Sequence, residues 1–307
     1  MKVLVTGAGG FIGRHFITVL RARGHECVAV SRIVDVVAGS VGVGDFELYD
    51  GWQQLMAGVE VVIHLAARVH VMSQGAEDHD ALYQSTNVDL TLRLAKEAAA
   101  AGVKRFIFLS SIKVNGEKTL DGKRFSEVDL PAPEDGYGCS KLAAEKGLQE
   151  LCMHSAMELV IIRPPLVYGA GVKANFQQLL KVSRRAIPFP LGRVKNRRDM
   201  VSVENLCDLI VTCLSHPAAA NQIFLVSDGC PYSLSGLLST MAEVQGRKIW
   251  LWPFPVSILS VMLWLLGKQP LSQPLLGDLE VDMTHTTEAL GWAPKSTLEE
   301  TLKKMVG

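Results

Sequence analysis

Residues 3–13 decide the fold, and they read Val3-Leu4-Val5-Thr6-Gly7-Ala8-Gly9-Gly10-Phe11-Ile12-Gly13. A short β-branched strand runs directly into glycines spaced G-x-x-G-x-x-G, and a helical pattern follows them. Glycine is needed where the backbone turns sharply and where it must approach a pyrophosphate without a Cβ in the way. The helix start adds free N–H groups and the positive end of its dipole. This context predicts a phosphate site for a dinucleotide rather than a tight turn that binds nothing.

The first half of the chain alternates short apolar strands with helices. Strands are expected at 3–5, 27–30, 59–65, 106–110 and 159–162, and helices at 14–23, 52–57, 88–101 and 137–153. Near-continuous apolar strands with helices between them indicate a parallel sheet that is covered on both faces. We therefore predict an α/β protein with a Rossmann-type, doubly wound parallel sheet.

The second half is less regular, with prolines after Arg163 and a return to the sheet through a helix at 203–214 and a strand at 223–226. The predicted dinucleotide-binding domain covers 1–168, with 196–226 returning to it. The predicted smaller C-terminal substrate-binding lobe covers 169–195 and 227–307.

One stretch, 249–266, carries no charge and is rich in Leu, Trp and Val. Its length touches the lower limit for a membrane span. Pro253 and Pro255 interrupt it, and its flanks lack a strong basic cluster. We expect a buried or lobe-packing helix rather than a span, with a peripheral membrane contact as the minor alternative.

The bulk composition gives no sign of several kinds of partner. The 307 residues carry 31 Lys and Arg against 31 Asp and Glu, so the balanced charge gives no reason to expect nucleic acid or an acidic membrane. A local basic patch stays open. None of the six cysteines forms a C-x-x-C pair or a zinc-type spacing, and Met1-Lys2 leads straight into a strand. We expect no metal and a cytoplasmic protein with reduced thiols.

The end of the second expected strand bears on the choice of cofactor. It reads Val30-Ser31-Arg32, without the acidic residue that binds a ribose 2′-hydroxyl. Arg32 is well placed for a 2′-phosphate, which favours NADP(H). If Arg32 instead stacks on the adenine, NAD(H) fits equally well.

Tyr137 and Lys141 lie four residues apart at the start of a helix, which places both on one face. A tyrosine with a pKa of about 10 is a poor base near neutrality. A lysine ammonium and an oxidised nicotinamide both favour the phenolate. Ser111, after the strand at 106–110, could hydrogen-bond the same substrate oxygen. Together they predict proton transfer at a carbinol beside a nicotinamide, unless the pair is an ordinary surface Tyr and Lys.

Most of the chain resembles the extended short-chain dehydrogenase/reductase superfamily, and within it the UDP-glucose 4-epimerase-like, NAD-dependent epimerase/dehydratase group. The matching pieces occur in family order: Thr6–Gly13, Gly44-Asp45-Phe46, His64-Leu65-Ala66-Ala67, Asn87-Val88, Leu109-Ser110-Ser111, Tyr137 with Lys141, Arg163–Gly169 and Arg198–Val203. Two strings, 110–117 and 164–169, are most similar to enzymes that reduce a 4-keto-6-deoxy UDP-sugar to UDP-N-acetylquinovosamine.

The resemblance implies site residues at matching positions. The catalytic residues would be Ser111, Tyr137 and Lys141. The cofactor would be held by Gly7, Gly9, Gly10, Phe11, Ile12, Gly13, Ser31, Arg32, Asp45, Phe46, Leu65, Ala66, Ala67, Asn87, Tyr137, Lys141 and Pro164. The substrate would be held by Ser111, Lys113, Asn175 and Arg198. Arg198 would pair with a diphosphate, since a guanidinium fork suits phosphate oxygens, or else with Asp199 or another acid.

Departures from the family pattern bear on the reaction. Lys113 replaces a small hydroxyl residue, Leu166 replaces an Asn near the sugar, and Gly277-Asp278 lacks the preceding Arg. The Asp-Glu pair of dehydratases is also missing. We expect 4-keto reduction or 4-hydroxyl oxidation of a UDP-sugar in surface-polysaccharide synthesis.

Several alternatives stay open at this point. The nearest is a UDP-glucose or UDP-N-acetylglucosamine 4-epimerase with tightly bound NAD. A reductase of non-sugar substrates and a non-catalytic NADP-sensing regulator are more remote. A homodimer through 88–101 and 143–153 is possible for this group.

Overall fold

A parallel sheet of seven strands, in the order β3-β2-β1-β4-β5-β6-β9, forms the centre of the molecule. The strands are β1 (Lys2–Thr6), β2 (Glu26–Ser31), β3 (Val41–Gly42), β4 (Val61–His64), β5 (Arg105–Leu109), β6 (Glu158–Arg163) and β9 (Gln222–Leu225). Every ladder in this sheet is parallel. The order reverses between β1 and β4, which is the switch point where doubly wound sheets bind ligands. The predicted fold class is confirmed.

This computed structural model describes residues 1–34, 36–69, 79–120, 122–172, 175–184, 188–267, 273 and 275–306. Its helices include α1 (Phe11–Ala22), α2 (Trp52–Leu55), α3 (His79–Tyr83), the π-helix η1 (Gln84–Asp89), α4 (Leu90–Ala100), the 3-10 helix η2 (Ile112–Val114), α5 (Gly136–Met153), α6 (Asn175–Ser183), α7 (Val203–Cys213), η3 (Pro217–Ala219), α8 (Leu234–Val244), α9 (Val256–Leu265), α11 (Thr284–Leu290) and α12 (Leu298–Val306).

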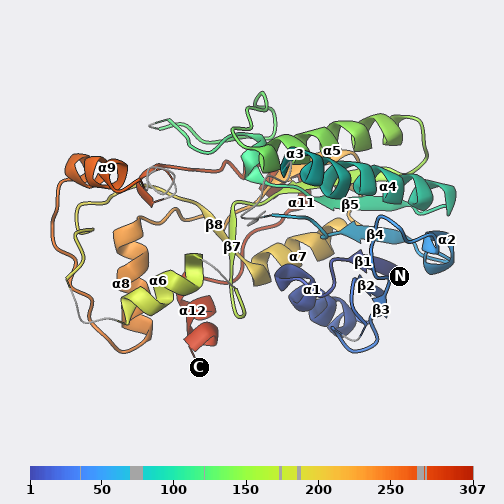
Figure 1. The fold of residues 1–307 in the computed structure, drawn as a ribbon. Helices are drawn as coiled ribbons and strands as arrows, with labels where there is room; N and C mark the ends of the chain where they lie inside the picture. The colour runs from blue at the N-terminus through green and yellow to red at the C-terminus, as the bar shows by residue number, and fades with distance from the viewer. Residues whose placement is uncertain are drawn as a thin grey trace.

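Helices cover both faces of the sheet (Figure 1). One hydrophobic core joins the sheet to α2, α4 and α5, and the other joins it to α1, α7 and α11. Every residue of β4 and β5 is buried, because helices shield both sides of these strands. This two-sided burial explains why the strands are continuous apolar runs instead of alternating ones.

A separate hydrophobic cluster lies in the part of the chain predicted to form the substrate lobe. It is built around Phe176, Leu238, Met241 and Leu302, from α6, α8 and α12. A second, two-stranded parallel sheet pairs β7 (Leu166–Tyr168) with β8 (Met200–Ser202). In contrast, α11 packs on the core of the large sheet. The division into two domains stays a prediction.

The uncharged stretch 249–266 forms α9 and the extended chain before it. Val256 and Leu259 pack against the lobe core, as expected for a lobe-packing helix. The expectation of a buried helix is wrong for the other sides, since Val261 is 55% exposed and Trp264 is 62% exposed. Among the residues that the structure describes, no helix combines the length and apolarity needed to cross a bilayer.

Candidate active site

The glycine loop after β1 touches the loop after β4. Gly7 has a φ of 73°, a conformation that L side chains rarely adopt. A Cβ on Gly7 would lie 2.7 Å from the backbone nitrogen of Ala66. A Cβ on Gly13 would lie 2.2 Å from the carbonyl oxygen of Gly7. The two glycines are therefore required for this close packing of strand, loop and helix.

The first turn of α1 opens directly out of this loop. Gly10 is its N-cap, and no side chain caps it. The N–H groups at the start of a helix have no intrahelical partner. Those of Phe11, Ile12 and Gly13 are therefore available to a phosphate, with the helix dipole adding attraction. The loop fits the pyrophosphate of a dinucleotide.

The other predicted cofactor residues follow the carboxyl ends of successive strands. These positions are Ser31 and Arg32 after β2, Asp45 and Phe46 after β3, Leu65, Ala66 and Ala67 after β4, and Pro164 after β6. Because the strands are parallel, these ends share one edge of the sheet. The topology thus brings together residues that are far apart in the sequence.

Individual positions at this edge differ in what their side chains can do. Arg32 is exposed, whereas the hydroxyl of Ser31 donates to the carbonyl of Ile33. Phe46 is only 7% exposed and packs against Trp52, with 5.6 Å between ring centroids. The side chain of Phe46 therefore belongs to the core, and only its backbone can face an adenine.

Asn87 holds the loop after β4 in place. Its Oδ1 accepts from Arg68 N at 2.8 Å, and its Nδ2 donates to Arg68 O and to Ser140 Oγ, both at 3.0 Å. The side chain is 1% exposed. Its direct role is to fix this loop against α5.

His64 belongs to the same buried network. In the sequence it is noted only as part of the motif His64–Ala67, and no local pattern assigns it a role of its own. Thr91 Oγ1 donates to the carbonyl of Asn87 at 2.7 Å, so it accepts from Nε2 of His64 at 2.9 Å. The other ring nitrogen, Nδ1, then accepts from Thr6 Oγ1 at 2.7 Å. Burial lowers the pKa of His64 to about 3, with the Lys141 charge adding to the effect. The neutral ring joins β1, β4 and α4.

Tyr137 and Lys141 share one face of α5, as predicted. Lys141 is 2% exposed, and its Nζ donates to the carbonyl of Leu109 at 2.8 Å, at the end of β5. Nζ lies 6.0 Å from the centroid of the Tyr137 ring and 4.4 Å from that of Phe108. The pair therefore lies at the cofactor edge of the sheet and is not an ordinary surface pair.

Burial dominates the protonation of both groups. It raises the pKa of Tyr137 well above the usual range, and the charges of Asp135 and Tyr83 act in the same direction. Burial also lowers the pKa of Lys141 to about 7. The sequence predicts that the Lys141 ammonium, together with a nicotinamide, lowers the phenol pKa. With the side chains alone, the burial of Tyr137 dominates and the pKa is raised instead. The phenol is the proton-carrying form.

Two serines follow β5. Ser111 caps η2, with its Oγ accepting from Lys113 N at 3.3 Å, and it is partly exposed. Ser110 was not predicted as a site residue, although it lies in the quoted motif. It is 3% exposed, and its Oγ has no hydrogen-bond partner within the described chain. An unpaired buried hydroxyl beside Lys141 is a further polar group available at this site.

Lys113, predicted to contact the substrate, is engaged in two ion pairs. Its Nζ lies 2.7 Å from Glu117 Oε1 and 2.6 Å from Asp135 Oδ2. Burial lowers its pKa, but these two carboxylates outweigh that effect and raise it. Asp135 also caps α5, since its Oδ1 accepts from Gly138 N at 2.7 Å. Lys113 thus neutralises the carboxylate that caps the helix of Tyr137.

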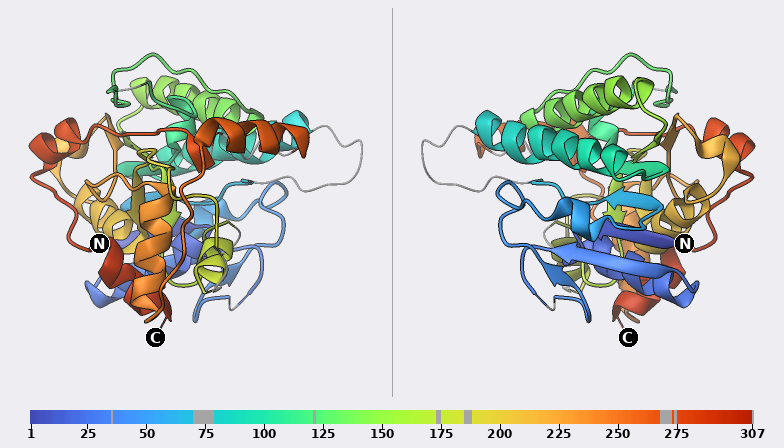
Figure 2. Two further views of the ribbon diagram at one scale, coloured as in Figure 1. Left: turned by 90° about the vertical axis from the view of Figure 1, so that its left-hand side faces the viewer. Right: turned by 90° about the vertical axis from the view of Figure 1, so that its right-hand side faces the viewer.

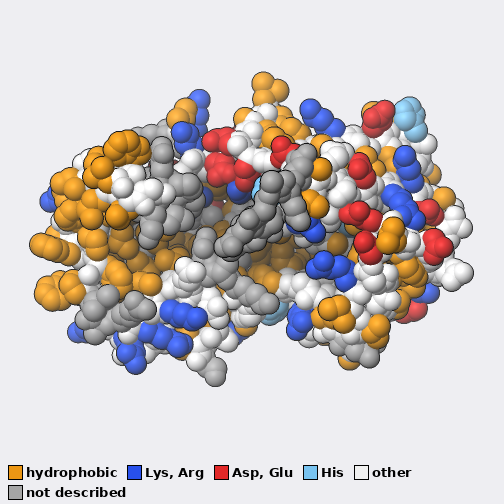
Figure 3. All heavy atoms as spheres, viewed as in Figure 1, with side chains coloured by type: hydrophobic (Ala, Val, Ile, Leu, Met, Phe, Trp, Pro, Cys, Tyr) orange, Lys and Arg blue, Asp and Glu red, His pale blue; other side chains and the backbone are white. Residues whose placement is uncertain are grey.

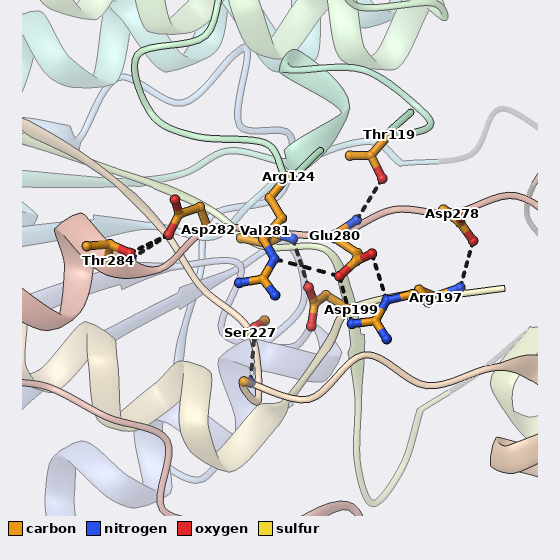
Figure 4. Close-up of polar contacts among 11 residues, drawn as sticks. Thr119, Arg124, Arg197, Asp199, Ser227, Asp278, Glu280, Val281, Asp282 and Thr284 are labelled. Atoms are coloured by element: carbon orange, nitrogen blue, oxygen red, sulfur yellow. Dashed lines mark hydrogen bonds and ion pairs between the residues drawn. The ribbon is translucent and has the colours of Figure 1, made fainter. Parts of the chain in front are cut away.

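Arg198 and its neighbour Arg197 have different surroundings. Arg197 pairs with Glu280 at 2.8 Å (Figure 4). Arg198 donates from Nη1 to the carbonyls of Gln273 and Gly277, at 3.3 and 3.1 Å. Within the described ranges, Arg198 forms no salt bridge. Its guanidinium remains free to pair with a phosphate.

Asp199, the suggested alternative partner of Arg198, is used elsewhere. Its Oδ2 accepts from Val281 N at 2.8 Å, and burial raises its pKa to about 6. It lines a pocket of about 340 Å³ together with Arg124, Ser227, Gly229, Pro231, Glu280, Val281, Asp282, Met283, Thr284, Thr287 and Glu288. No predicted site residue lines this pocket. The side chain of Asn175, also predicted to contact substrate, lies outside the described residues.

The glycine loop, the parallel sheet and the Ser–Tyr–Lys set define an enzyme of the short-chain dehydrogenase/reductase class. The chain belongs to the NAD dependent epimerase/dehydratase family, whose profile matches residues 3–227. This membership confirms the predicted resemblance, the enzyme class and the nicotinamide dinucleotide cofactor.

Known proteins resemble it over nearly its full length. A UDP-glucose 4-epimerase of Vibrio cholerae is 44% identical over 307 residues, which are 99% of this chain and 94% of that protein. The structure of MoeE5 in complex with UDP-glucose and NAD matches with a TM-score of 0.78 and 27% identity, covering 100% of this chain and 97% of that one. A short-chain dehydrogenase/reductase superfamily protein from Agrobacterium tumefaciens with bound NAD has a TM-score of 0.80 at 23% identity, covering 100% and 96% of the two chains. That last match supports the fold alone.

Proposed function

We propose that this chain is a 4-epimerase of a UDP-hexose that keeps NAD bound throughout its reaction. The sequence alone favours 4-keto reduction or 4-hydroxyl oxidation of a UDP-sugar. The 44% identity with the Vibrio cholerae UDP-glucose 4-epimerase, over nearly the whole of both chains, favours the epimerase. Both reactions need the same proton-transfer groups, so the geometry of the catalytic residues is compatible with either one.

One observation carries the chemistry. Lys141 is buried, and its Nζ is fixed on the carbonyl of Leu109, 6.0 Å from the Tyr137 ring, at the sheet edge that the glycine loop also occupies. A phenol held in this way can take the proton of a sugar hydroxyl and return it. Ser111 would orient the same oxygen through its Oγ.

The chain's own residues control the proton in this scheme. A bound nicotinamide would supply the hydride transfer, in which a hydride leaves C4 of the sugar and then returns to the opposite face of the sugar ring. Burial keeps the proton on Tyr137. The phenol therefore becomes a base only when further positive charge, such as an oxidised nicotinamide would bring, adds to that of Lys141. This arrangement limits proton removal to a loaded site.

Arg198 would select the nucleotide part of the substrate. Its guanidinium is held by backbone carbonyls and not by a carboxylate, which leaves its charge to a diphosphate. Arg198→Glu should abolish UDP binding in calorimetry and leave dinucleotide binding intact. Loss of both ligands would show a folding defect, and retained UDP binding would contradict this role.

The decisive experiment separates the two reactions. The purified chain should carry a dinucleotide through gel filtration and should interconvert UDP-glucose and UDP-galactose without added NADH or NADPH. A chain that elutes empty and consumes NADPH with a 4-keto UDP-sugar would reject the epimerase in favour of the reductase. The product is read by NMR, which reports the configuration at C4.

Tyr137→Phe tests the mechanism directly. Because this change removes only the phenolic hydroxyl, we expect turnover to fall about a hundredfold to ten-thousandfold, with UDP binding unchanged. Cys139→Ser is the matched control, since Cys139 lies on the same helix turn and is exposed. Equal turnover of Tyr137→Phe and the wild type would remove the phenol from the mechanism.

A homodimer through α4 and α5 is a further part of this proposal. The two helices lie side by side on the same face of the sheet (Figure 1). Met153, at the end of α5, is 75% exposed. Light scattering of the wild type and of Met153→Glu would test it: a dimer that the charge weakens is expected, and a monomeric wild type would contradict it.

A further inference from the structure

The C-terminal lobe exposes a set of large apolar side chains on α9 and the chain before it. Three of the five tryptophans lie here: Trp250 is 70% exposed, Trp252 60% and Trp264 62%. The other two, Trp52 and Trp292, are buried. Other exposed apolar side chains of the set are Ile258, Val261, Met262, Leu265 and Leu266. A concentration of this kind on a soluble fold marks an interaction surface.

The helix α9 lies at the outer end of the molecule. It stands apart from the sheet at the left of Figure 1, and the left view of Figure 2 looks directly onto it. Figure 3 shows hydrophobic side chains gathered at that end, with no Asp or Glu among them on this face. One side of α9 holds it on the lobe through Val256 and Leu259, while Ile258, Val261, Met262, Trp264 and Leu265 are exposed.

Two segments of the lobe, 169–195 and 231–277, carry a net positive charge, whereas the rest of the lobe carries a net negative one. Residues 169–195 contain six Lys or Arg and no Asp or Glu. Glu243 is the single acidic residue between 231 and 277. The exposed basic residues in these ranges include Lys181, Arg184, Arg193, Lys195, Arg247 and Lys248. The balanced total that argued against an acidic membrane therefore conceals two basic segments of the lobe.

Backbone contacts tie the segment that carries Arg193 to the tryptophan segment. Gly192 N donates to Trp252 O at 2.9 Å, and Arg193 follows Gly192 directly. Phe189 N donates to Trp250 O at 2.9 Å. The segment that carries Arg193 is thus tied to the tryptophan segment, and the two form one continuous edge.

Two more arginines, Arg184 and Arg247, approach the same edge. The Nη1 of Arg247 donates to the backbone carbonyl of Arg184 at 3.1 Å, so the two segments that carry these arginines are in contact. Lys248 follows Arg247 and precedes Trp250 by two positions. Basic side chains therefore border the exposed tryptophans.

We propose that this lobe docks on the surface of an anionic lipid bilayer, with α9 and the three tryptophans entering the headgroup region. Tryptophan favours that region because its ring is apolar while its N–H stays hydrated. Lysine and arginine beside it attract anionic headgroups. An uncharged helix bordered by cations matches both layers of such an interface.

The helix lies in the plane of the membrane and does not cross it. It has 10 residues, whereas a span needs about 20. A second copy of the chain is a poorer occupant of this surface, because the basic segments of two copies repel each other. The proposal does not depend on which sugar reaction the active site performs.

The test is flotation of the full-length wild type with vesicles of two compositions. We expect it to float with phosphatidylcholine–phosphatidylglycerol vesicles, to float much less with phosphatidylcholine alone, and to detach as salt rises. Tryptophan emission should shift to the blue on binding, a change that comes from the exposed three since the other two are already buried. Absence of flotation with the anionic vesicles would overturn the proposal.

Two sets of variants, one of apolar and one of charged residues, locate the contact with the bilayer. The apolar set comes first. Trp250→Ser combined with Trp252→Ser and Trp264→Ser should reduce vesicle affinity more than tenfold, because each change removes an apolar side chain from the bilayer. The matched control is Val128→Ser with Leu130→Ser, which removes side chains that are 81% and 90% exposed elsewhere on the chain. That control should bind vesicles as the wild type does.

The charge variants complete the test. Arg247→Glu with Lys248→Glu should reduce affinity for the anionic vesicles about 25-fold or more, at roughly fivefold for each cation lost. Lys118→Glu with Lys123→Glu is the control of equal charge, also at exposed positions. Epimerase activity in solution should be unchanged in all four proteins, which also verifies folding.

Other outcomes would reject the lipid surface. If the tryptophan variant abolishes self-association in light scattering without lipid, the surface joins two copies of the chain. If both charge variants weaken vesicle binding equally, attraction is general and the lobe is not the docking face. If the tryptophan variant binds as tightly as the wild type, α9 does not enter the bilayer.

Discussion

Lys141 gives a prediction that links the active site to stability. Burial lowers the pKa of its ammonium from 10.5 to about 7. In the unfolded chain the lysine regains its ordinary pKa, so between these values the unfolded state binds more protons than the folded one. Stability should therefore rise as pH increases through this window. Below it both states are protonated, and the full penalty for burying the charge remains.

The size of the effect follows from this shift. One pKa unit corresponds to about 1.4 kcal/mol, so the free energy of unfolding should gain about 2 kcal/mol from this group between about pH 7 and about pH 9. Lys141→Met lacks the titrating group and should not show this gain. At about pH 8 the variant should be more stable than the wild type by about 1 kcal/mol. Relief of about 3 kcal/mol is partly offset by loss of the hydrogen bond from Nζ to the buried Leu109 carbonyl, which then lacks this donor.

Urea denaturation of both proteins across this pH range measures the difference, and turnover should be lost in the variant. Lys104→Met is the control, because its ammonium is on the surface, 3.1 Å from Glu60, and should change stability by less than about 0.5 kcal/mol. Parallel curves of stability against pH for Lys141→Met and the wild type would refute the reasoning. They would mean that the folded chain solvates this ammonium as well as water does.

Three further predictions each concern one buried or closely packed residue. Gly13→Ala places a Cβ 2.2 Å from backbone, so we expect about 1–3 kcal/mol of destabilisation and lost dinucleotide binding. Gly147→Ala meets only a flexible side chain and should retain binding in calorimetry. Because burial lowers the pKa of His64 to about 3, the unfolded state takes up its proton first as pH falls below 6.5. Stability should drop by about 2 kcal/mol near pH 5, and His64→Gln should remove that drop in urea titrations. Glu145→Gln strands the buried Arg163 guanidinium, paired at 2.6 Å, and should cost about 3 kcal/mol in urea denaturation, whereas a loss under about 1 kcal/mol would contradict the pairing.

The sequence by itself determined the parts of the protein that depend on local spacing. The glycine loop could be read because the turn after β1 tolerates no Cβ at Gly7 and Gly13. The alternation of apolar strands and helices predicted the parallel sheet, because strands buried on both faces lose polar positions. The four-residue spacing of Tyr137 and Lys141 fixed their common face on α5, since helical geometry alone sets it.

Only the tertiary structure decided which groups are buried and which charges meet. Burial reversed the expected direction of the Tyr137 pKa, and it placed His64 between Thr6 and Thr91. The ion pair of Lys113 with Asp135 and the separate surroundings of Arg197 and Arg198 depend on segments that are not adjacent in the chain. The placement of 249–266 was also decided by the tertiary structure, because its apolar composition fits a buried helix as well as an exposed one. Its exposure depends on what packs against α9, and that is a long-range property that no local pattern records.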